Sequence, residues 1–247
     1  MVSDESNSGP SPSILPLAQI STAWSVVMNA RQGDRINQEE MTRFFARYQG
    51  AVLRYFRTAV RNQDIAEDLT QDFALKFIRG GFQAAHPEGG RFRDFLRVAL
   101  ANQLRDHHRR QQHRRNENEY SERLVEQVVE NEPTENFESN WRDELLAHTW
   151  SDLELHQQST GQMYYTALRL KAESDGVVGS ELVRLFSDRS GVATTETAYR
   201  KLLQRARRQF GELLLRNVAD TLSVPTRDEL ARELADLKLL IYCNELL

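Results

Sequence analysis

Carboxylate side chains between Asp64 and Asp68 are the first residues of this chain whose types and spacing could do chemistry. Asp64, Glu67 and Asp68 form a D-x-x-E-D sequence, and such carboxylates could hold a metal ion for hydrolysis. However, no nearby histidine ligands, glycine-rich phosphate loop, or Ser–His or Cys–His pair accompanies them. We therefore expect no enzyme, no metal site and no cofactor, and we interpret these residues as part of a binding surface.

The carboxylates lie on one side of a predicted amphipathic helix. Apolar residues recur at the i, i+3, i+7, i+11 spacing that lines one helical face, and they are Ala66, Leu69, Phe73 and Phe77. The polar stripe on the other side consists of Asp64, Asp68, Gln71 and Asp72. Taken alone, such an acidic stripe is typical of a solvated helix face.

A second predicted helix, which follows a Gly/Pro-containing loop, carries basic side chains. Its inward residues are Phe92, Phe95, Leu96 and Ala99. Its outer rows carry Arg93, Arg97, Asn102, Arg105, Asp106 and Arg109. Arginines can follow DNA phosphates, and an asparagine can hydrogen-bond a base edge. An acidic stripe followed by a basic one indicates two partners of opposite charge.

These two helices resemble region 2 of the bacterial sigma factors, in particular the extracytoplasmic-function (ECF) type. The family's D-A-E-D-L-x-Q-E segment is matched by Asp64, Glu67, Asp68, Leu69, Gln71 and Asp72. The F-R-x-[WF]-L…A-x-N-x-x-x-D-x-x-R-R segment is matched by Phe92, Arg93, Phe95, Leu96, Asn102, Asp106, Arg109 and Arg110. Residues 22–34 also resemble the opening segment of an ECF-like subgroup.

The resemblance implies two partners for this half of the chain. Core RNA polymerase, through the clamp helices of its largest subunit, would bind Asp64, Asp68, Leu69, Gln71 and Asp72, with Leu69 as an apolar contact. The promoter −10 element would bind Arg91, Arg93, Arg97, Asn102, Arg105, Arg109 and Arg110. The loop through residues 86–90 is either the place of a flipped promoter base or an ordinary turn.

The second half of the chain predicts a helix-turn-helix. A turn at residues 187–194 precedes an amphipathic helix over residues 195–217, which Thr194 or Thr195 would cap. The sequence T-E-T-A-Y-R-K-L-L-Q-R-A-R-R-Q-F resembles sigma region 4, although Tyr199 replaces a small β-branched residue and the turn is longer than usual. The implied contacts to the −35 element are Thr195, Glu196, Thr197, Arg200, Lys201, Gln204, Arg205 and Arg208.

We therefore predict an all-α protein of five segments. They are a disordered tail (1–20), a region 2-like domain (21–112), an acidic linker (113–140), a region 4-like domain (141–218) and a helical C-terminal extension (219–247). The linker is either a solvated spacer or a segment that folds back over the basic helix. The extension either packs on the region 4-like domain, with Leu230, Leu234, Leu237, Leu240 and Ile241 as its apolar stripe, or binds a regulator.

Composition agrees with a soluble cytoplasmic factor. The 247 residues are 40% hydrophobic and 28% charged, with no apolar run long enough to span a membrane and no secretory signal. Cys243 is the single cysteine, which excludes an internal disulfide and leaves a redox switch as a remote hypothesis. The net charge of −4 argues against tight nonspecific DNA binding. Local basic faces nevertheless decide contact, because charges more than about 8 Å apart are largely screened.

The predicted function is that of an ECF-like sigma factor that directs core RNA polymerase to promoter DNA and assists strand separation. The flap of the polymerase's second subunit, and an anti-sigma factor or other regulatory protein, are further candidate partners. The alternative is a free-standing helix-turn-helix regulator whose N-terminal bundle senses a signal or dimerises. No membrane role is expected.

Overall fold

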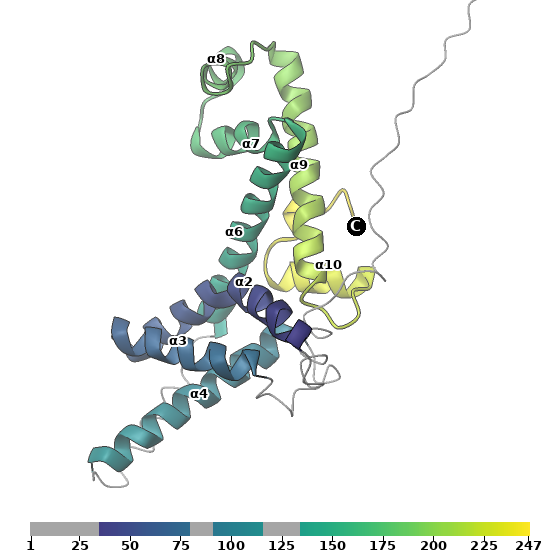
Figure 1. Cartoon of the computed structure of the whole chain (residues 1–247). Coiled ribbons are helices and arrows are strands. Elements are labelled where there is room, and N and C mark those ends of the chain that lie inside the picture. The colour runs from purple at the N-terminus through teal and green to yellow at the C-terminus, as the bar shows by residue number, and fades with distance from the viewer. Residues whose placement is uncertain (1–34, 80–90, 116–133) are drawn as a thin grey trace, which may run out of the picture.

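The computed structural model describes residues 35–79, 91–115 and 134–247, and all their regular elements are helices (Figure 1). The predicted tail, the segment 22–34, the loop at 80–90 and most of the acidic linker lie outside these residues. Whether that linker folds back over the basic helix therefore stays a prediction.

Three helices form the first part of the molecule. They are α2 (Arg35–Val60), α3 (Gln63–Ile78) and α4 (Phe92–Arg115). Their interface is aromatic, because Phe44, Phe77 and Phe92 contact one another with ring centroids 5.1 to 6.2 Å apart. Large rings bury much apolar area per residue, so this cluster supplies a core shared by the three helices.

A long helix, α6 (Thr134–Thr160), joins this part to the rest of the chain (Figure 1). The predicted linker was too long at both ends, because α4 continues to Arg115 and α6 begins before residue 141. Phe137 and Trp141 explain the early start of α6, since both are buried in the core formed by α2, α3 and α4. Their burial stabilises helix where composition alone indicated a spacer.

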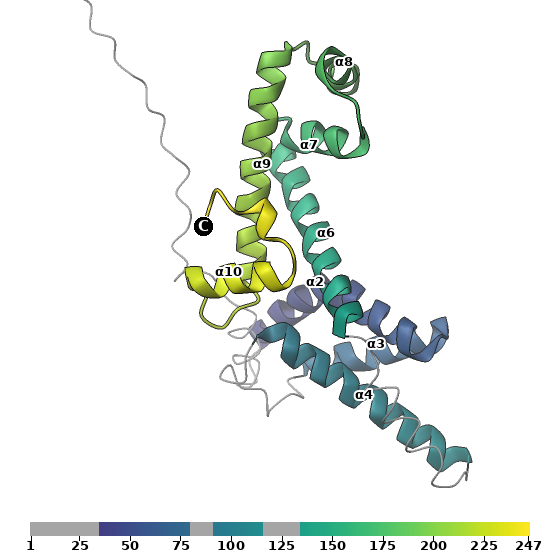
Figure 2. The same cartoon turned by 180° about the vertical axis from the view of Figure 1, so that it is seen from behind.

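The described residues after α6 form five helical elements, of which α9 is the longest. They are α7 (Tyr164–Glu173), α8 (Gly179–Ser190), α9 (Glu196–Ala219), α10 (Arg227–Asp236) and the short 3₁₀ helix η4 (Leu240–Tyr242). Figures 1 and 2 show α7 and α8 beside the N-terminal end of α9, with α10 and η4 beside its C-terminal half. The C-terminal extension therefore packs against α9, in agreement with the first of its two predicted alternatives.

A second, smaller core joins α7, α8 and the start of α9. Its buried residues are Ala167, Leu170, Leu182, Phe186, Tyr199 and Leu203. Tyr199, the departure from the usual sequence, fills this core, contacts the Phe186 ring at 4.9 Å and donates a hydrogen bond to the Ala167 carbonyl at 3.1 Å. The larger side chain therefore has a structural role in holding α7 against α9.

The turn before α9 is shorter than predicted. Helix α8 continues to Ser190, and Gly191 ends it in the left-handed conformation at φ 70°. Glycine adopts this conformation without steric cost, so it serves as a helix C-cap. Thr195 then caps α9 by accepting a hydrogen bond from the Ala198 N–H at 3.2 Å.

Two features fix the C-terminal extension. Thr226 caps α10, and Leu230, Leu234 and Leu237 are buried as predicted, whereas Ile241 is 75% exposed. Gly211 lies inside α9 at a position where a side chain does not fit. A Cβ there would be 2.7 Å from the Tyr242 carbonyl oxygen. The absent side chain lets the last residues approach the helix closely.

Candidate functional site

The acidic stripe of α3 is a solvent-exposed surface. Asn62 begins the helix by accepting a hydrogen bond from the Ile65 N–H at 3.0 Å. We call the exposed polar residues of one side of α3 the acidic face, and they are Asp64, Asp68, Gln71 and Asp72. The structure therefore brings four of the five predicted polymerase contacts together on one surface.

The fifth residue of that prediction is misplaced. Leu69 is only 3% exposed and packs in the main core, so the expectation that it is an apolar contact for a partner is wrong. The reason is its spacing, since Leu69 shares the face of Ala66 and Phe73. Leu75 is 49% exposed and lies four residues after Gln71, on the acidic face. Helical spacing alone identifies Leu75, because it follows Gln71 by four residues on the polar side of α3.

Helix α4 presents a basic surface along its length after the first turn. Asn102, Arg105, Arg109 and Arg110 are exposed, and Arg97 is half-buried. We call these five residues the basic face. The Asn102 side-chain oxygen accepts a hydrogen bond from Arg105. Asp106 lies 4.0 Å from the ammonium of Lys76 on α3.

Arg91 and Arg93, at the start of α4, are separated from the basic face. Arg93 was expected on an outer row, but its side chain is 4% exposed and contacts Glu138 of α6 at 2.9 Å and Glu233 of α10 at 2.8 Å. Arg91 contacts the second oxygen of Glu233 at 2.9 Å and also pairs with Asp236. The expected outer position of Arg93 is therefore wrong, since it shares a helical face with the buried Leu96 and Leu100. We call the paired residues the arginine–carboxylate cluster, and they are Arg91, Arg93, Glu138, Glu233 and Asp236.

The cluster shifts the pKa values of its members. Burial raises the pKa of Glu233 even though Arg93 and Arg91 oppose the shift. Arg91 has a raised pKa, because its hydrogen bond to Asp236 and the charge of Glu233 outweigh partial burial. Sequence reasoning missed Glu233, although it stands on the apolar stripe of α10 between Leu230 and Leu234. A carboxylate at such a position indicates a buried cationic partner.

The N-terminal half of α9 carries the other predicted nucleic-acid contacts. All eight predicted −35 residues are exposed there. Two of its arginines pair along the helix, Arg200 with Glu196 at 2.9 Å and Arg208 with Glu212 at 3.0 Å. The free N–H groups at the start of a helix attract phosphate, so Thr195 marks a favourable end for nucleic acid.

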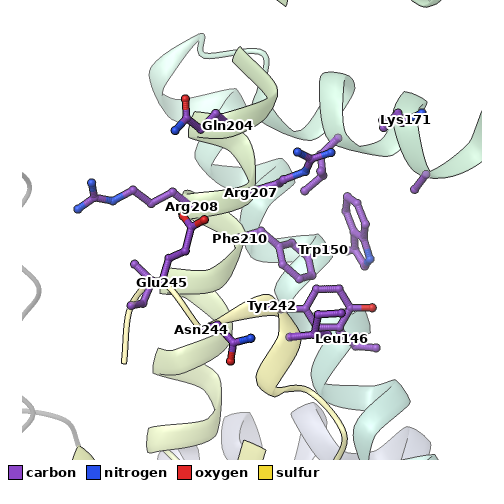
Figure 3. Close-up of a pocket in the computed structure, with 14 residues that line it drawn as sticks. Leu146, Trp150, Lys171, Gln204, Arg207, Arg208, Phe210, Tyr242, Asn244 and Glu245 are labelled. Atoms are coloured by element: carbon purple, nitrogen blue, oxygen red, sulfur yellow. The ribbon is translucent and has the colours of Figure 1, made fainter. Parts of the chain in front are cut away.

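A pocket of about 760 Å³ lies between α6, α7, α9 and the C-terminal residues (Figure 3). Its apolar lining includes the rings of Trp150, Phe210 and Tyr242. The centroid of the Phe210 ring lies 5.0 Å from that of Trp150 and 6.0 Å from that of Tyr242. Figure 3 shows Arg208 pointing away from the three rings. The pocket is thus an apolar surface with cationic neighbours, on the side of α9 that faces α6.

The described residues show no metal site, no reactive thiol and no membrane-spanning helix. No group of His, Cys, Asp and Glu there is arranged to hold a metal ion. Cys243 is buried against α9, and desolvation raises the pKa of its thiol to about 12. A thiol that stays protonated is a poor redox switch. Within the same ranges, none of the helices combines the length and apolar character needed to cross a bilayer.

Comparison with known proteins identifies the first three helices. Residues 44–114 match the family model for sigma-70 region 2, a segment that runs from α2 through α3 to near the end of α4. No curated protein matches the chain, and no solved structure does. The matched segment is therefore similar to region 2 of the sigma-70 family.

Proposed function

We propose that this chain is an ECF-like sigma factor that carries core RNA polymerase to specific promoters and assists strand separation. One observation carries the proposal: the family match spans two consecutive helices, one with an exposed acidic face and the other with an exposed basic face. The factor performs no covalent chemistry, and it acts by binding two partners at once.

Polymerase binding is assigned to the acidic face of α3. Asp68, Gln71 and Asp72 offer acceptors to basic side chains of the clamp helices, and complementary charge favours both rate and register of association. Leu75 supplies an exposed apolar contact at the C-terminal end of the same surface. Protein interfaces depend on apolar contacts that become buried within a polar rim when the partners associate.

The −10 element is assigned to α4. Arg105, Arg109 and Arg110 are exposed and bind phosphates, while Asn102 hydrogen-bonds a base once Arg105 turns to a phosphate. Extruding a base from the duplex costs a few kcal/mol, which stacking and cationic surfaces recover. The loop at 80–90 is the segment of this half where such a base would be held, and it lies outside the described residues.

The −35 element is assigned to the N-terminal half of α9, with α8 as the first helix of the helix-turn-helix. Exposed basic residues at the capped end of a helix suit entry into a major groove. The pocket beside Trp150 offers the apolar surface that the flap of the second polymerase subunit would contact. Ile241, 75% exposed at its edge, is free to join that contact.

Core-polymerase binding by an α3 variant tests the function. Asp68→Arg with Gln71→Ala changes only exposed side chains, so folding should be unaffected. We expect the double variant to lose core binding and run-off transcription while isolated-chain binding to promoter DNA is unchanged. Asp143→Arg on α6, also exposed, is the matched control. Unchanged core binding by the α3 variant would contradict the proposal and favour a free-standing DNA-binding regulator.

A further inference from the structure

The first turn of α4 is enclosed by the C-terminal extension. Helix α10 contributes Glu233 and Asp236 to Arg91 and Arg93, and the Phe92 N–H donates to the Thr221 carbonyl at 3.4 Å just before α10. Figure 2 shows α10 lying over the beginning of α4. Residues more than 120 positions apart in the sequence therefore meet at one charged contact.

This contact uses the donors that DNA phosphates would need. Both guanidinium groups of the arginine–carboxylate cluster point to carboxylates, and that of Arg93 is 4% exposed. A guanidinium cannot bind a carboxylate and a phosphate through the same N–H groups. The acidic side chains would in addition repel a phosphate backbone at this end of α4.

The buried face of α10 is apolar except for Glu233. Leu230, Leu234 and Leu237 already bury an apolar stripe, and Glu233 interrupts it with a carboxylate that is 1% exposed. Replacement of buried ion pairs by apolar residues is often neutral or stabilising. Glu233 therefore specifies which residues α10 contacts, and those residues are the two arginines.

We propose that α10 is an intramolecular latch, in which Glu233 and Asp236 occupy Arg91 and Arg93 in the free chain and withhold them from DNA. The inference rests on the proposed function for the role of α4 at the −10 element. Opening would withdraw the two carboxylates of α10 and leave Arg93 with Glu138 of α6 as its acidic partner. Asp236, at 48% exposure, is the accessible edge of the cluster. DNA bound along the basic face would then gain two further cationic contacts.

Matched variants on α10 test the latch. Asp236→Asn removes a carboxylate of the cluster, whereas Asp228→Asn removes an exposed one from the same helix outside it. Binding of the full chain to a forked −10 DNA is measured by fluorescence anisotropy over a series of salt concentrations. We expect Asp236→Asn to bind about 10-fold more tightly and to steepen the salt dependence by one to two released ions, about 0.9 for each duplex phosphate contact. Asp228→Asn should change the affinity by less than about 2-fold.

Arg91→Ala establishes whether the gain passes through the latch. The gain from Asp236→Asn should shrink in the Arg91→Ala background, because non-additivity reports a shared interaction. Part of the gain should remain, since Asp236 also lies 3.5 Å from Arg93. Glu233→Gln provides a second opening variant, with circular dichroism as its folding check. Equal gains from Asp236→Asn and Asp228→Asn, or a gain that Arg91→Ala leaves undiminished, would overturn the latch. Failure to bind core polymerase would overturn the proposed function alone, since the DNA titrations test the latch separately.

Discussion

The indole ring of Trp141 lies flat on the phenol ring of Tyr48, with centroids 4.6 Å apart and planes 8° from parallel. Tyr48 belongs to α2 and Trp141 to α6, so this stack joins the segment that matches region 2 to the helix leading into the rest of the chain. Both residues are buried, and burial raises the pKa of the Tyr48 hydroxyl. The two halves of the protein share a core at this point.

Trp141→Ala should destabilise the whole chain by about 3–5 kcal/mol, the usual cost of removing a large buried ring. Trp141→Phe should lower the free energy of unfolding much less, because Phe retains an aromatic ring. The substitution also loses no hydrogen bond, since the indole N–H has no partner among the described residues. Denaturant unfolding followed by circular dichroism measures both. A loss below about 1 kcal/mol for the alanine variant would contradict the importance of the stack.

Two leucines of α3 should respond in opposite ways. Leu75→Ala should weaken core-polymerase binding about 10-fold, the effect of losing an apolar interface contact, with little change in unfolding free energy. Leu69→Ala should instead destabilise the protein by about 2–5 kcal/mol because Leu69 is buried. Val98→Ala, which truncates a 56% exposed residue on α4, is the control for binding. Equal polymerase affinity for Leu75→Ala and Val98→Ala would remove Leu75 from the interface.

Arg205 tests the assignment of α9 to duplex DNA. Arg205→Ala should weaken binding to a −35 duplex at all salt concentrations and lower the slope of log K against log salt by about 0.9. Arg232→Ala makes the same charge change on the exposed side of α10 and should leave the slope unaltered. The measurement is a fluorescence anisotropy titration at several salt concentrations, and identical slopes for the two variants would count against α9 as the reader.

The His148–Glu144 pair should make stability depend on pH. Its hydrogen bond to Glu144, 3.5 Å away, and a second to the Arg47 carbonyl raise the pKa of His148 above 6.5. The stabilisation is therefore complete below pH 6.5 and is lost as the pH rises through the raised pKa.

Glu144 has the opposite dependence. Burial alone would raise its pKa, but hydrogen bonds from His148 and Arg54 hold the pKa below 4.5, so its contribution is present above pH 4.5 and is lost in acid. The unfolding free energy should be greatest between these limits, and His148→Gln should flatten its decline above neutrality. Urea unfolding across this pH range makes the measurement, and an unchanged decline in His148→Gln would exclude the pair as the cause.

The sequence predicted much of the candidate site because local spacing determines helical faces. The acidic residues of α3, the Thr195 and Thr226 caps and the buried face of α9 all follow from periods and cap preferences within one helix. Leu75 and Glu233 could also have been identified in this way, as an apolar residue on a polar stripe and a carboxylate on an apolar stripe.

Contacts between distant segments were decided only by the tertiary structure. The sequence by itself determined an all-helical chain, the acidic face of α3 and the exposed basic residues of α4 and α9. It did not determine that α10 meets the start of α4, which buries Arg93 and engages Arg91. The physical reason is that periodicity specifies which side of a helix is apolar, whereas the partner of that side depends on how all the helices pack together.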